Sequence, residues 1–97
     1  EVVSIRQCDT SATVVRELAL IKVSAAGTAR VGVIETANIF RARIVDVAVD
    51  SLIIEATGGE DKIASLIRLL EPFGIKELVR TGLTAMERGA AVLEKDL

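Results

Sequence analysis

The segment "ARIVDVAVDSLIIEATG", Ala42–Gly58, contains two short runs in which apolar and polar residues alternate. Such alternation is typical of strands with one buried face, and it predicts strands at Ile44–Val49 and Leu52–Thr57. The apolar residues predicted to share a face are Val45, Val47 and Val49 in the first strand and Leu52, Ile54 and Ala56 in the second. Asp50-Ser51 between them predicts a tight turn, although the Asn-Gly or Asp-Gly pair that favours such turns is absent. The segment therefore predicts an antiparallel hairpin.

A predicted helix flanks this hairpin on each side. Upstream, Thr28–Phe40 has Thr28 as a candidate N-cap and one apolar helical face made of Val33, Ile34, Ala37 and Phe40. Downstream, "EDKIASLIRLLEPFG", Glu60–Gly74, has a clearer apolar stripe made of Ile63, Leu66, Ile67 and Leu70. Acidic residues begin this second helix and a proline and a glycine end it, as helix polarity and stop signals require.

Two further strands, predicted at Leu18–Val23 and Ile75–Leu83, complete the order βαββαβ. This order predicts an α+β, ferredoxin-like fold, with a four-stranded antiparallel sheet and both helices on one face. The predicted core is Leu20, Ile34, Phe40, Val47, Ile54, Ile63, Ile67 and Leu70. The segment after the last strand, "MERGAAVLEKDL", is predicted to be a polar tail that could form a helix, and Val2–Gln7 is an additional strand-like segment.

The uncovered face of this sheet needs water or a partner, because two helices cover only one face. That face contains Ile53, Glu55 and Thr57, a mixture of apolar and polar side chains that is typical of protein interfaces. We therefore expect a homodimer that buries this face, with Val2–Gln7 available to extend a neighbour's sheet.

The composition argues against nucleic-acid binding, catalysis and metal binding. The 97 residues carry a net charge of −2 and only 2% aromatic residues, so nothing predicts a nucleic-acid surface. The chain has no histidine, which removes the usual general base and most transition-metal sites. No catalytic, cofactor-binding or metal-binding residue is predicted.

The cysteine content and the hydropathy predict a location. Cys8 cannot form an internal disulfide, which fits a reducing compartment. No apolar run approaches 18 residues, so we expect a cytoplasmic protein that does not enter membranes.

Two other functions share this fold and stay open at the level of the residues. An acylphosphatase-like hydrolase would use Arg30 in the turn "SAAGTAR", although that turn lacks a continuous glycine cradle. A stand-alone ferredoxin-like domain of another oligomeric regulator could sense a small molecule. "TGGEDK", Thr57–Lys62, lacks the spacing of a phosphate-binding loop and is interpreted as a strand-to-helix turn.

Four motifs in register, "RELALIKV", "IFRARIVDV", "EATGGEDKI" and "GIKELVRTGLTAMERG", resemble the C-terminal domain of the small, regulatory subunit of acetolactate synthase from about Val15 to Gly89. The resemblance implies a non-catalytic subunit in the biosynthesis of valine, leucine and isoleucine. Its partner, the catalytic subunit, would carry thiamine diphosphate, magnesium and flavin. The small subunit would raise the activity of that partner and make it sensitive to valine.

The resemblance also implies a domain organisation. Residues 1–14 are expected to be the last strand and linker of an N-terminal ACT domain that this chain lacks, residues 15–85 the ferredoxin-like domain, and residues 86–97 the tail. Because the family's valine sites belong to the ACT domain, valine is not expected to bind this chain. Arg80 and Arg88 are the candidate contacts with the catalytic subunit. The alternative is that both are solvated, or that they lie near Glu71 or Glu87 at a helix end.

Overall fold

A computed structural model describes residues 12–89 and contains eight elements along the chain. They are β1 (Thr13–Ser24), α2 (Ala29–Ile39), β2 (Arg43–Val47), β3 (Ser51–Gly58), α3 (Glu60–Leu70), the 3₁₀ turn η1 (Glu71–Phe73), β4 (Ile75–Arg80) and β5 (Thr84–Glu87). The predicted order βαββαβ is confirmed, with β5 in addition. Val2–Gln7 and Cys8, on which part of the sequence interpretation depends, lie outside the described residues.

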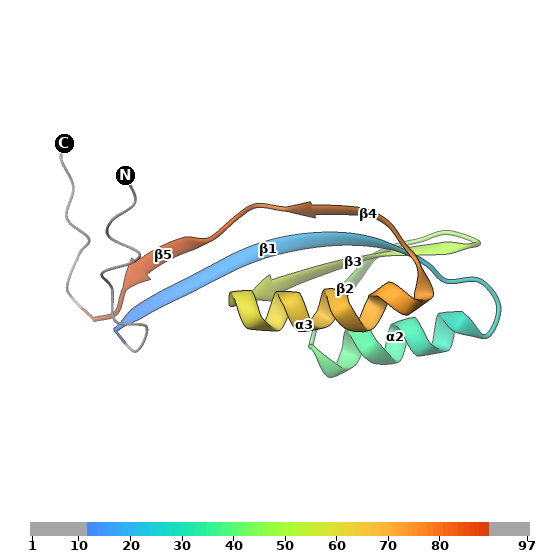
Figure 1. The fold of residues 1–97 in the computed structure, drawn as a ribbon, viewed down its shortest axis with the longest axis horizontal. Coiled ribbons are helices and arrows are strands. Elements are labelled where there is room, and N and C mark those ends of the chain that lie inside the picture. Colours follow the sequence, from blue (N-terminus) through green and yellow to red (C-terminus); the bar gives the residue numbers. More distant parts are fainter. Residues whose placement is uncertain (1–11, 90–97) are drawn as a thin grey trace.

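The sheet has the strand order β2-β3-β1-β4, and every neighbouring pair is antiparallel. β5 pairs with the first part of β1 and continues the ladder that β4 begins. Both helices lie on one face of the sheet, and the β1–β5 ribbon extends beyond them (Figure 1). The fold is therefore ferredoxin-like α+β, with a two-stranded extension at one end.

The core lies between the two helices and the sheet. Twelve buried hydrophobic residues form it: Ala19, Ile21, Val23, Ala25, Val33, Ala37, Leu52, Ile54, Ala56, Ile63, Leu66 and Leu70. Of the predicted core, Ile54, Ile63 and Leu70 are buried, while Ile34, Phe40 and Ile67 pack against it in part. None of the described helices is long and apolar enough to cross a membrane.

Leu20 and Val47 were wrongly predicted to be core residues. Leu20 is 37% exposed, because β1 directs Ala19 and Ile21 toward the helices and Leu20 toward the open face. Val47 is 66% exposed, because it is the last residue of β2, which is an edge strand. A continuous apolar run shows that a strand is present without showing which alternate residues face inward.

The hairpin turn is also longer than predicted. β2 ends at Val47 and carries a bulge between Ile44 and Asp46, so Val45, Val47 and Val49 do not form a buried face. Val49 is 88% exposed in the turn. The guanidinium of Arg30, in the first turn of α2, closes this turn by donating hydrogen bonds to the carbonyl oxygens of Ala25, Ala48 and Val49.

Helix α2 begins after Thr28, as predicted, but the Thr28 side chain makes no capping hydrogen bond. Gly32, which interrupts the helical pattern, lies under the ring of Phe73 from η1. A Cβ at this position would lie 2.9 Å from the Cζ of Phe73. Glycine therefore allows the turn after α3 to pack closely against α2.

The last strand was predicted as one piece, Ile75–Leu83, followed by a helical turn, and both parts of this prediction were wrong. β4 ends at Arg80, and Thr84–Glu87, which includes the first two residues of the predicted tail, Met86 and Glu87, is strand β5. At the other end, β1 begins at Thr13, so part of the expected linker is strand.

Candidate functional site

The junction between β4 and β5 contains a β-bulge. Arg80 pairs with Ala19 and Thr84 pairs with Arg16, so the three residues 81–83 face the two residues 17–18 of β1. One residue is therefore extra, which locally bends a strand and increases its twist. Gly82 has φ +86°, a conformation that costs glycine little and other residues more.

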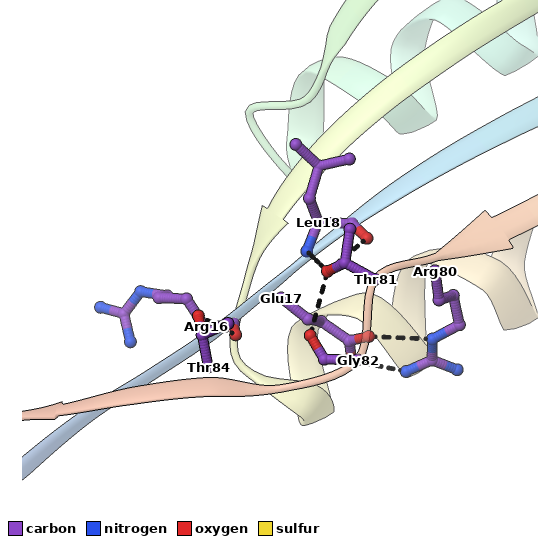
Figure 2. A network of polar contacts seen from close by, with 7 residues as sticks. All are labelled: Arg16, Glu17, Leu18, Arg80, Thr81, Gly82 and Thr84. Carbon is purple, nitrogen blue, oxygen red and sulfur yellow. Dashed lines mark hydrogen bonds and ion pairs between the residues drawn. The ribbon is translucent and has the colours of Figure 1, made fainter. Parts of the chain in front are cut away.

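Threonine hydroxyl groups hold this bulge against β1 (Figure 2). The Leu18 backbone N–H donates to Thr81 Oγ1 at 3.0 Å, and the Thr81 backbone N–H donates to the Leu18 carbonyl at 3.0 Å. The Thr81 hydroxyl in turn lies 3.0 Å from the Gly82 carbonyl, to which it can donate its one proton. The Thr84 hydroxyl donates to the Arg16 carbonyl at 3.1 Å. Side chains thus replace the backbone bonds that the bulge interrupts.

An ion pair between Arg80 and Glu17 lies beside the bulge (Figure 2). Arg80 Nε donates to Glu17 Oε1 at 3.1 Å and Nη2 donates to Oε2 at 2.6 Å, so the contact is bidentate. The Glu17 side chain is 3% exposed and that of Arg80 is 36% exposed. Arg80 therefore contacts Glu17, and not Glu71 or Glu87 as one alternative held.

The pair shifts the pKa of both groups. The hydrogen bond from Arg80 holds the pKa of Glu17 below its usual value, assisted by the charge of Arg80 and opposed by burial. The hydrogen bond to Glu17 likewise raises the pKa of Arg80, with a smaller contribution from the charge of Glu60. Both groups are therefore charged across the neutral pH range.

Arg80 and Arg88 do not form one site. The Arg88 backbone N–H donates to the Ala12 carbonyl at 2.9 Å, which places Arg88 at the far end of the ribbon. Arg80 lies opposite Ala19, seven residues farther along β1, so the two backbones are separated by about 23 Å of strand. Both arginines are exposed, Arg80 at the start of the bulge and Arg88 at the far end of the ribbon.

Sequence reasoning missed Glu17, although the sequence contains a signal for it. In "RELALIKV" this glutamate lies in phase with Ala19, Ile21 and Val23, which form the buried face of β1. A carboxylate on a buried face requires a cationic partner, and Arg80 in the "RTG" motif supplies it. The three residues of this motif thus have separate roles: Arg80 forms the ion pair, the Thr81 hydroxyl bonds to β1, and Gly82 adopts the left-handed backbone conformation.

The structure does not support an anion site at Arg30. Its guanidinium already donates to three backbone carbonyl oxygens, which fixes the side chain against the hairpin turn. Within residues 12–89, no group of three His, Cys, Asp or Glu side chains is arranged to hold a metal ion. The polar features of the described domain therefore organise strands and turns.

Comparison with known proteins supports the resemblance seen in the motifs. A family model described as the small subunit of acetolactate synthase matches residues 16–89. A probable acetolactate synthase small subunit from Archaeoglobus fulgidus is 56% identical over 80 residues, covering 82% of this chain and 50% of that protein. The small subunit from Mycobacterium bovis is 48% identical over 88 residues, covering 91% of this chain and 52% of that protein. The chain thus spans about half the length of these curated relatives.

A solved structure agrees with the sequence comparison. The crystal structure of an acetolactate synthase small subunit from Thermotoga maritima superimposes with a TM-score of 0.78 at 36% identity, covering 84% of this chain and 50% of that one. The match of the family model runs from β1 through β5, and includes both helices and the "RTG" bulge. The chain belongs to the family of acetolactate synthase small subunits.

Proposed function

We propose that this chain is part of a non-catalytic regulatory subunit, which binds and activates the thiamine-diphosphate-dependent catalytic subunit of acetolactate synthase. The observation that carries the proposal is the family match over residues 16–89, which is nearly the whole described domain. The enzyme would serve valine, leucine and isoleucine biosynthesis. Thiamine diphosphate, magnesium and flavin would be bound by the catalytic subunit.

Valine control is proposed to depend on an ACT domain and not on residues 12–89. The turn before α2 supports this division, because both backbone groups of Ala25 are already used: its N–H donates to the Asp50 carbonyl oxygen, and its carbonyl accepts from Arg30. A valine ligand also needs an acceptor for its ammonium group, and residues 24–30 contain no acidic side chain. This chain is therefore proposed to contribute partner binding without valine recognition.

The contact with the catalytic subunit is proposed to use the partly exposed arginines, Arg80 and Arg88. Arg80 presents its guanidinium beside the bulge while Glu17 fixes its orientation, so a partner carbonyl or carboxylate would meet a preorganised donor. Arg88 is exposed at the ribbon end. The domain is also proposed to self-associate through the open face of its sheet.

The proposal is tested by adding the purified 97-residue chain to the catalytic subunit and measuring acetolactate formation from pyruvate. We expect saturable binding and increased activity, with no activity from the chain alone and no added inhibition by millimolar valine. Bovine serum albumin at equal mass is the control for nonspecific stabilisation. Absence of binding in a pull-down, or pyruvate conversion by the chain alone, would contradict the proposal.

A further inference from the structure

Helix α2 ends in a Schellman motif. The Arg41 backbone N–H donates to the Asn38 carbonyl oxygen at 3.0 Å. The Ala42 backbone N–H reaches farther back and donates to the Ala37 carbonyl oxygen at 2.9 Å. In this motif the residue after the helix cap, which here is Arg41, adopts a left-handed conformation and is most often glycine. Arg41 accordingly has φ +57°.

Arg41 differs from the other residues with a left-handed backbone. Within residues 12–89 the others are all glycines: Gly27, Gly74, Gly82 and Gly89. A side chain makes this conformation less stable, because its Cβ comes close to a backbone carbonyl oxygen. The turn cannot open easily to relieve this, since Ala37 is buried and Ala42 packs against the core. Arginine at this position therefore makes the fold less stable than glycine would.

No polar contact of the Arg41 side chain within residues 12–89 offsets this cost. The side chain is exposed, and its guanidinium has neither an ion pair nor a hydrogen bond with a described residue. Arg30 and Arg80 differ in this respect, because both have fixed acceptors. The positive charge does favour the C-terminal end of α2. A basic residue in the last turn of α2, where none is present, would supply that charge without a left-handed backbone.

The residues around Arg41 have the composition of a protein interface. Ile39, in the last turn of α2, is 75% exposed. Arg43, at the start of β2, is exposed and adds positive charge, although Glu55 lies opposite it on β3. Arginine is enriched at the centre of interfaces, where an apolar side chain beside it excludes water and strengthens its ion pairs. A guanidinium pairs best with a planar carboxylate. The surface therefore fits a partner that presents a carboxylate beside an apolar group.

We infer that Arg41 and Ile39 form a further contact with the catalytic subunit, in which the Arg41 guanidinium binds a carboxylate of that subunit and Ile39 packs against an apolar side chain beside it. A second copy of this chain is disfavoured as the occupant, because a two-fold axis at this surface would bring two Arg41 side chains together. The contact is separate from Arg80, which lies at the junction of β4 and β5 and is already paired with Glu17. The inference rests on the proposed function.

Arg41→Gly tests this inference, because it should change stability and affinity in opposite directions. Glycine relieves the left-handed backbone, so the Tm should rise by about 2–6 °C in thermal unfolding monitored by circular dichroism. The same change removes the guanidinium, so the Kd for the purified catalytic subunit, measured by calorimetry, should rise about tenfold. Arg41→Lys keeps the charge and the backbone strain, so its Tm should stay native. Its Kd should rise by less, because lysine offers the charge without the planar fork that binds a carboxylate.

Two further variants complete the design. Ile39→Ser should raise the Kd several-fold with little effect on the Tm, since this side chain is already exposed. Arg68→Gln is the matched control, because Arg68 is an exposed arginine of α3 that has no ion pair with a described residue. It should change neither the Tm nor the Kd.

The outcomes separate the inference from the proposed function. Native binding together with an unchanged Kd in Arg41→Gly overturns the inference and leaves the proposed function intact. An equal loss of affinity in Arg68→Gln also overturns it, because any exposed arginine would then serve. A fall in the Tm of Arg41→Gly overturns it too, since the arginine would then stabilise the end of the helix. A native chain that does not bind the catalytic subunit overturns both.

Discussion

Replacement of Gly82 by alanine tests whether the bulge depends on a left-handed backbone. Gly82 has φ +86°, and a Cβ added there would meet nothing within 4 Å, so Gly82→Ala introduces no clash. The cost comes from the backbone conformation, because an L-residue other than glycine in the left-handed region is destabilised by about 1–2 kcal/mol. We expect the free energy of unfolding to fall by this amount.

The assay is thermal or urea unfolding at fixed protein concentration. For a domain of this size, each kcal/mol corresponds to a loss of about 4–8 °C in Tm. Gly82→Asn should lose less, because asparagine tolerates left-handed φ values better than alanine does. Gly59→Ser is the control, since Gly59 has φ −74°, has open space around it and precedes α3, where serine is a favoured cap. Native stability in Gly82→Ala would refute the role given to the bulge.

Three further predictions follow from the same contacts. Because the folded pKa of Glu17 is depressed below 4.5, its pair with Arg80 stabilises the fold above the unfolded pKa, and this contribution is lost as pH falls through the folded pKa. Glu17→Gln should therefore lower the Tm most at neutral pH, and the difference from the native chain should shrink below about pH 4; a constant difference would contradict this. Thr81→Val should cost about 1 kcal/mol in urea unfolding by removing the acceptor of the Leu18 N–H, and Thr81→Ser should not. Ile21→Ala should cost about 2–5 kcal/mol and Leu20→Ala much less, because the first side chain is fully buried and the second is 37% exposed; equal losses would contradict the assigned faces of β1.

The order of elements and the two helices could be predicted because their signals are local. The apolar stripe of α3, with acidic residues at its start and Pro72 after its end, identifies a helix without tertiary information. Which alternate residues of β1 and β2 face the helices could not be predicted in this way. A run such as "LALIKV" is apolar on both faces, and only the helices that pack on one face decide that Ile21 is buried while Leu20 is not.

The candidate site was predicted only in part for a related reason. Arg80 was singled out by its motif, but its partner is 63 residues away in sequence, and no local pattern links them. The break after Arg80 was missed because strand propensity continues through "RTGLTAME", and a single extra residue in a ladder has no signature except the glycine that accommodates it. A charged residue in phase with a buried strand face was the one sign of this arrangement in the sequence.

Strand β1 has a mechanical consequence for any larger assembly. Its 12 residues span about 40 Å without a break, from the far end of the packed sheet, where Ser24 pairs with Ser51, to the end of the ribbon. Because one continuous strand belongs to both parts, the ribbon cannot swing on a loop. A rotation of the packed sheet is therefore expected to move the tip of the ribbon with it, because β1 joins Thr13 to Val23 in the core without a loop. The Glu17–Arg80 pair lies where the packed sheet ends and the ribbon begins.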